Sequence, residues 1–132
     1  MSTRSSISIK NSDGTFTGIC CHFDGYPSGN GKILLEHYTE EAKVQELIAL
    51  GDLSSLGAQV KPSSPEHRYG NREPGVTVAY HRDRGEDFED TAPITSCNWP
   101  IKEIKFAYNY LFCDGVWRMN GALLTAEIVA ED

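Results

Sequence analysis

Polar side chains that could hold or activate a ligand are concentrated in the segment CHFDGYPSGNGK, residues 21–32. His22, Asp24 and Tyr26 alternate along it, so all three would project from one face if the preceding strand continues. An imidazole, a carboxylate and a phenol placed in this way can exchange protons or hydrogen bonds with a ligand. In the competing interpretation, Asp24 caps a turn, Tyr26 packs against the fold and backbone groups satisfy His22.

Glycines precede a lysine in the second half of this segment, where a helix is expected to begin. Free N–H groups at a helix start attract anions, so Gly29, Gly31 and Lys32 are predicted to contact an anionic group. The P-loop pattern G-x4-G-K-[ST] is not met, because five residues separate Gly25 from Gly31 and Ile33 replaces the magnesium-binding Ser or Thr. The loop therefore favours anion binding over P-loop ATP hydrolysis.

A second charged cluster, YHRDRGE, directly follows a predicted strand. Arg82 and Arg84 alternate in it, and guanidinium groups bind phosphate or carboxylate through paired hydrogen bonds. Asp83 and Glu86 offer a competing interpretation, in which they neutralise the arginines in a solvated salt-bridge cluster. Taken with Arg4 near the chain start, the segment predicts that Arg4, Arg82, Asp83 and Arg84 line one basic pocket for a small anionic ligand.

Metal and thiol chemistry are disfavoured by spacing. The four histidines lie far apart without an HExxH pattern, and the four cysteines show no CxxC pattern. We therefore expect no metal, no cofactor and no catalytic residue, with the cysteines reduced and buried. An enzymatic alternative stays open, in which His22 and Asp24 act with His81 or Glu86 on a nucleotide.

Length and charge limit the classes of protein to which the chain can belong. The 132 residues fit one domain, 1–132, and the net charge of −7, from 19 acidic and 12 basic residues, argues against direct binding of nucleic acid. No apolar run is long enough for a membrane helix, and the first residues lack the apolar region of a secretory signal. We therefore expect a cytoplasmic protein that does not bind membranes.

Hydrophobic periodicity predicts the elements that must position these residues. Alternating runs and turn residues predict strands at 5–10, 15–23, 76–80, 105–113 and 116–119. The last two should form a hairpin through Asp114-Gly115, with Phe106, Tyr108, Tyr110 and Phe112 facing the core.

Two helices should follow the first hairpin. One is expected from Lys32 to Tyr38, with Asn30 or Ser28 as its N-cap, and a second between Thr39 and Gly51. Residues 61–75, rich in Pro and Gly, predict a surface loop or flap. The whole pattern predicts an α+β fold, with a mainly antiparallel sheet of about five strands and the helical pair on one face.

Four segments together carry a resemblance to a known group of proteins: MSTRSSISI, GICCHFDGYPSGNGKILLEHY, LIALGDLSSLG and GVTVAYHRDRGE. The chain resembles a family of small uncharacterised phage and prophage proteins with STRS, CH[FW]DGYP, LGDLSSLG and YxRDRGE-like segments. It departs from the family at Cys20, where a tyrosine is usual, and at Asn30, where valine is usual.

The resemblance implies an accessory protein that acts against host defence. In that setting we expect a non-catalytic protein that binds and sequesters a small anionic, nucleotide-derived ligand. The first alternative is a protein–protein inhibitor whose acidic surface docks on a host defence complex; the second is the nucleotide-processing enzyme. A homodimer is the expected assembly, because two copies often line each site in small pocket proteins.

Overall fold

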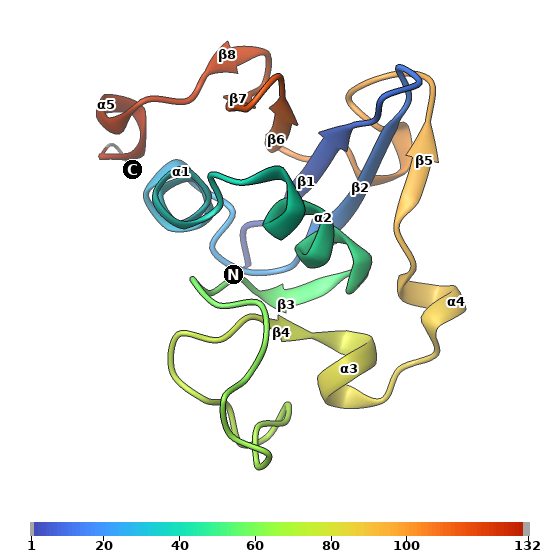
Figure 1. Ribbon diagram of the computed structural model, residues 1–132, viewed down its shortest axis with the longest axis vertical. Helices are drawn as coiled ribbons and strands as arrows, with labels where there is room; N and C mark the ends of the chain where they lie inside the picture. Colours follow the sequence, from blue (N-terminus) through green and yellow to red (C-terminus); the bar gives the residue numbers. More distant parts are fainter. Residues whose placement is uncertain (1, 131–132) are drawn as a thin grey trace.

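The N-terminal strand β1 (Ser5–Lys10) lies inside one sheet and is paired along both edges. It runs antiparallel to β2 (Phe16–Cys21) and parallel to β6 (Tyr108–Cys113), which comes from the other end of the chain. This is seen in the computed structural model, which describes residues 2–130 (Figure 1). The other strands are β3 (Leu53–Ser55), β4 (Val78–Ala79), β5 (Ile94–Ser96), β7 (Val116–Met119) and β8 (Ala122–Leu123).

The sheet order is β4-β3-β2-β1-β6-β7-β8, with β5 paired to the first half of β2. The predicted α+β class is confirmed, and five of the seven strand pairings are antiparallel. The expected number of about five strands is wrong, because the sheet has eight. Strands β3, β5 and β8 span only two or three residues, which is too short for a period of two to be recognised.

Helices α1 (Lys32–His37) and α2 (Glu41–Ala49) cover one face of the sheet (Figure 1). The sequence predicts this pair, and its apolar side chains join those of β1 and β2 in the main core. The buried members include Ile7, Ile9, Ile19, Leu34, Tyr38, Val44, Leu47 and Ile48. Alternation along β1 therefore places Ile7 and Ile9 under the helices, together with Ser5, and places Ser6 and Ser8 on the opposite face.

The predicted N-cap of α1 is wrong. A π-helical turn, η1 (Pro27–Gly31), runs directly into α1, and no side chain caps either start. The Asn30 amide is buried and donates instead to Ser5 Oγ at 3.0 Å and to the Phe23 carbonyl at 3.2 Å. This asparagine therefore fastens the loop to β1 rather than terminating a helix.

The opposite face is covered by the chain around the 3₁₀ turn η2 (Lys102–Ile104). Ile101 and Ile104 are buried there, and a methyl group on Gly18 of β2 would lie 3.1 Å from each. Gly18 lacks a side chain because the covering segment approaches the strand this closely.

The charged cluster YHRDRGE forms helix α3 (Tyr80–Arg84) and the turn after it, and α4 (Phe88–Thr91) follows. The Asp114-Gly115 hairpin is confirmed, because both residues have the positive φ angles of a type I′ turn, 53° and 80°. A last helix, α5 (Ala126–Val129), follows β8. Within residues 2–130 no helix has the length and apolar character needed to cross a membrane.

Tyr110 provides a test of this packing. Its hydroxyl is buried and donates to the Gly25 carbonyl at 2.8 Å, joining β6 to the loop that precedes η1. Tyr110→Phe should lower the free energy of unfolding by about 1–2 kcal/mol, because the carbonyl is left without a donor away from water. Urea denaturation measures the change, with Tyr108→Phe in the same strand as the matched control. Equal losses in the two variants would contradict the role assigned to this bond.

Candidate functional site

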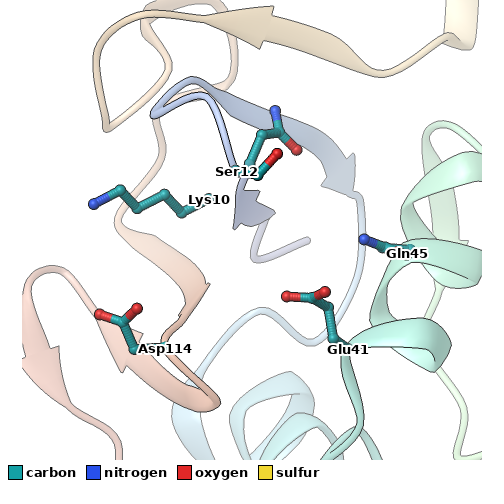
Figure 2. Close-up of a pocket in the computed structure, with 6 residues that line it drawn as sticks. Lys10, Ser12, Glu41, Gln45 and Asp114 are labelled. Carbon is teal, nitrogen blue, oxygen red and sulfur yellow. The ribbon is translucent and has the colours of Figure 1, made fainter.

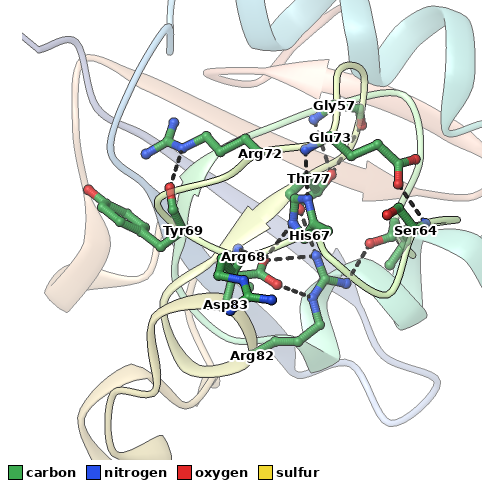
Figure 3. Close-up of polar contacts among 12 residues, drawn as sticks. Gly57, Ser64, His67, Arg68, Tyr69, Arg72, Glu73, Thr77, Arg82 and Asp83 are labelled. Carbon is green, nitrogen blue, oxygen red and sulfur yellow. Dashed lines mark hydrogen bonds and ion pairs between the residues drawn. The ribbon is translucent and has the colours of Figure 1, made fainter.

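The Asp83 carboxylate is the hub of a buried polar network (Figure 3). Its side chain is only 3% exposed. It accepts hydrogen bonds from Arg82 Nε at 2.9 Å, from Arg82 Nη2 at 3.0 Å and from the Ala79 N–H at 2.8 Å. Burial alone would raise the pKa of Asp83, but these donors, the charge of Arg82 and the neighbouring His67 imidazole outweigh it and hold the pKa below its usual value.

Arg82 uses its guanidinium group within the fold. Besides Asp83, it donates to the carbonyl oxygens of Val60 and Thr77, both at 2.6 Å. These bonds join α3 to the two ends of the segment 61–75, which we call the strap. Of the two interpretations of YHRDRGE, neutralisation by a neighbouring carboxylate applies to Arg82 and Asp83, but the expected solvated cluster is wrong for this pair, because the Asp83 side chain is buried. Their predicted contact with a ligand has no support in this geometry.

His67 links the strap to the same hub. Its imidazole is fully enclosed, with Nε2 3.4 Å from Asp83 Oδ2. Its Nδ1 accepts the Glu73 N–H at 2.9 Å, so the ring proton must lie on Nε2 and face Asp83. The sequence did not single out this histidine, because its partner lies 16 residues further along the chain, on α3.

Tyr69, Arg72, Tyr80 and Arg84 form a second group, which we call the arginine–tyrosine cluster. The rings of Tyr69 and Tyr80 stack at 6.2 Å with an interplanar angle of 29°. The guanidinium carbon of Arg84 lies 5.0 Å from the Tyr69 ring centre and 5.9 Å from that of Tyr80, and Arg72 lies 4.7 Å from the Tyr69 ring. In Figure 3 Tyr69 and Arg72 point together away from the buried network.

Arg84 is an accessible cation of this cluster, and Arg72 is exposed as well. The Arg84 side chain is 53% exposed, and the carboxylate of Glu86 is 3.8 Å away. At that exposure and distance the ion pair is weak, so the guanidinium can exchange it for a ligand anion. The second interpretation of YHRDRGE, a basic group open to ligands, stays a prediction for Arg84.

Arg4 lies within electrostatic reach of Cys20. Burial and the Asp52 carboxylate raise the pKa of the Cys20 thiol to about 11, against the opposing charge of Arg4. Burial also raises the pKa of Tyr80, with Tyr69 and Cys20 adding to the effect and Arg84 opposing it. Cys20 is thus within electrostatic reach of both Arg4 and Tyr80, but none of the contacts that define the arginine–tyrosine cluster involves Arg4.

The polar side chains of the loop 22–31 are occupied locally. Tyr26 Oη donates to Asp24 Oδ1 at 2.9 Å, and the Asp24 carbonyl accepts the Asn30 N–H at 2.8 Å. His22 packs edge-on against Phe23, with ring centres 4.4 Å apart. The contacts of Asp24 and Tyr26 match the competing interpretation of the segment, a structural loop, whereas His22 contacts the Phe23 ring instead of backbone groups. Among residues 2–130, no hydrogen bond or ion pair joins His22 or Asp24 to Arg82 or Arg84.

The predicted anion-binding backbone is also occupied. The Gly29 N–H donates to the Tyr26 carbonyl at 2.9 Å. A methyl group on Gly29 would collide with the Asp24 carbonyl, and one on Gly31 would lie 3.1 Å from Tyr110 Oη, so packing requires both glycines. Lys32 lies elsewhere, in a hollow of about 270 Å³ between α1 and α5.

A surface hollow of about 510 Å³ lies apart from all these groups. It is lined by polar residues of both charges, including Lys10, Glu41 and Asp114 (Figure 2). It has no aromatic wall, and its side chains do not converge on a point. A hollow of this composition gives a ligand little apolar surface to bury.

Asp83 provides a test of the network. Asp83→Asn keeps the shape but leaves Arg82 without its counter-ion, so unfolding should become easier by about 2–4 kcal/mol at neutral pH. The folded pKa of Asp83 lies below the unfolded value, so its contribution is complete above about pH 4 and is lost as the pH falls through the folded pKa.

The difference in the free energy of unfolding between wild type and Asp83→Asn should therefore become smaller as the pH falls. Chemical denaturation between neutral and acidic pH measures it, with Asp87→Asn on exposed α4 as the matched control. A constant difference across that range would contradict the assigned role of the carboxylate.

Comparison with known proteins adds no relative from which an activity could be transferred. No protein-family model matches the chain, and no characterised protein or solved structure gives a significant match. The site is therefore defined by its own geometry, which is that of a cationic and aromatic surface cluster on an acidic protein.

Proposed function

We propose that the protein binds a small anionic, nucleotide-derived ligand at the arginine–tyrosine cluster without altering it. The observation that carries this proposal is the exposed guanidinium of Arg84 above two stacked tyrosine rings. Guanidinium groups bind phosphate through paired hydrogen bonds, and tyrosine rings stack on the flat faces of bases. A ligand that combines a phosphate with a base uses both.

The acidic character of the rest of the chain favours a small ligand over a polymer. With a net charge of −7, the protein repels a long phosphate backbone, whereas one or two phosphates respond mainly to the local cations. Arg72 and Arg84 supply these cations within the cluster.

The resemblance to phage proteins suggests the biological setting. A phage accessory protein that holds a nucleotide-derived immune signal would lower its free concentration in the host cell and so delay the defence response. Tight binding without chemistry is sufficient for this role, and the cluster contains no group placed as a nucleophile or a general base.

Calorimetric titration with AMP, ADP, ADP-ribose and cyclic mono- and dinucleotides tests the proposal. We expect at least one of them to bind, and Arg84→Ala to weaken that binding about 10- to 100-fold, as expected for the loss of a charge-assisted hydrogen bond. Arg118→Ala, which removes an exposed arginine from β7, is the matched control for the change in net charge. Absence of binding across the panel, or equal weakening by both variants, would contradict the proposal. Recovery of a chemically altered ligand would favour the enzymatic alternative.

A second candidate function rests on α4. Phe88 is 39% exposed there, with exposed carboxylates at Asp87, Glu89 and Asp90, and its ring lies 5.0 Å from that of His81. An apolar anchor among carboxylates suits a basic protein surface that has an apolar pocket. Such contact could block a host defence complex that otherwise binds nucleic acid.

Capture of host proteins at low and high salt tests this second function. Binding through α4 should be lost in Phe88→Ala and should weaken as salt rises, because salt screens the carboxylates. Phe23→Ala removes an equally exposed phenylalanine, 39%, and should leave capture unchanged. Capture that is independent of salt and of Phe88 would exclude a role for this surface.

A further inference from the structure

The strap, residues 61–75, carries half of the arginine–tyrosine cluster, Tyr69 and Arg72. It contributes no apolar side chain to the core of the described chain. Its shape is set internally by Glu73, whose carboxylate accepts the N–H groups of Ser63 and Ser64 and the Ser63 hydroxyl. Segments held by polar contacts rather than apolar burial open at low free-energy cost.

The middle of the strap is hydrogen-bonded to the body of the protein at one residue, Asp83. The Asp83 carbonyl accepts the Tyr69 N–H at 2.9 Å, and its carboxylate faces His67 Nε2 at 3.4 Å. At the ends of the strap, the Gln59 N–H donates to the Gly75 carbonyl at 3.1 Å. We call this bonded pair of ends the base of the strap. Release of the contacts at Asp83 would therefore free the middle of the strap while its base stays attached.

Opening of the strap does not leave the Asp83 carboxylate without a partner. Asp83 keeps both hydrogen bonds from Arg82 and the one from the Ala79 N–H, which lie outside the strap. His67 keeps its bond from Glu73, which belongs to the strap, and its Nε2–H can donate to water. The cost of opening is thus one hydrogen bond and one polar contact exchanged for water, together with the loss of ring contacts, rather than the cost of a buried orphan ion.

We infer that the strap is a lid, latched by His67 and Tyr69 on Asp83, that assembles the ligand site when it closes. This rests on the proposed function for the identity of the site. Tyr80 and Arg84 stay on α3 when the lid opens, whereas Tyr69 and Arg72 leave with the strap. A ligand that contacts both halves binds the closed state better and so shifts the equilibrium towards it.

Hydrogen exchange of the free protein tests the lid without any ligand. The Tyr69 amide, bonded to the Asp83 carbonyl, reports opening of the latch. It should exchange at least about 100-fold faster than the amides that pair β1 with β6, because local opening does not need the sheet to unfold. Exchange of all these amides at one common rate would overturn the inference, since the strap would then open only with global unfolding.

His67→Ala tests the latch itself. Loss of the polar contact with Asp83 should speed exchange at Tyr69 by about tenfold and should leave the β1 and β6 amides unchanged. His37→Ala, on the exposed end of α1, is the matched control. Equal acceleration in the strap and the sheet would mean that His67 acts on global stability, and would also overturn the inference.

ADP-ribose is the probe that tests whether closure of the strap is coupled to ligand binding at the arginine–tyrosine cluster. At saturation it should slow exchange of the Tyr69 amide, and this effect should be weaker in Arg84→Ala. If ADP-ribose binds and Tyr69 exchange is unchanged, the lid is wrong while the proposed function stands. If neither ADP-ribose nor the other nucleotides bind, the proposed function fails, and the ligand-free exchange still decides whether the strap opens.

Discussion

The Asp83 carboxylate joins three parts of the molecule that are separate in sequence. It neutralises Arg82, whose other donors bind the carbonyls of Val60 and Thr77, and it accepts the backbone N–H of Ala79 at the end of β4. It also faces the enclosed imidazole of His67. A carboxylate this deeply placed is stable only with such donors, and the donors in turn fix where the strap can lie.

The network around Asp83 gives different environments to Arg82 and Arg84, which look equivalent in sequence. Arg82 and Arg84 stand two residues apart on one short helix, and a pattern of alternating arginines gives both the same prediction. Arg82 turns inward and makes four hydrogen bonds to carbonyl groups and Asp83, whereas Arg84 lies over aromatic rings with a half-exposed side chain. The hydrogen bonds of Arg82 thus hold α3 in place, and α3 carries Arg84 at the surface.

In the segment 21–32, by contrast, several polar side chains are already bonded within the fold and are not available to a ligand. Its polar groups suggest a binding loop, yet the Asp24 side chain accepts from Tyr26 and the Asn30 amide is bound to β1 and to the loop backbone. Its glycines lie where a side chain would strike Asp24 or Tyr110. A long connection buried between a strand and a helix must satisfy its own backbone, and these residues do so.

The sequence by itself determined the features that depend on neighbours along the chain. Alternation predicted β1, β2 and β6, the Asp114-Gly115 pair predicted the closing hairpin, and apolar spacing predicted the two helices on one face. The strap was recognisable from its prolines and glycines. These signals are local because they reflect side-chain direction, turn geometry and backbone freedom.

Tertiary structure alone decided which distant groups meet. The parallel pairing of β1 with β6 joins the two ends of the chain, and β3 pairs with β2 through a single residue pair, Cys21 and Leu53. The contacts of His67 with Asp83 and of Tyr69 with Tyr80 depend on the path of the strap. No spacing rule predicts them, because the partners are brought together by the packing of the whole sheet and not by the period of any one element.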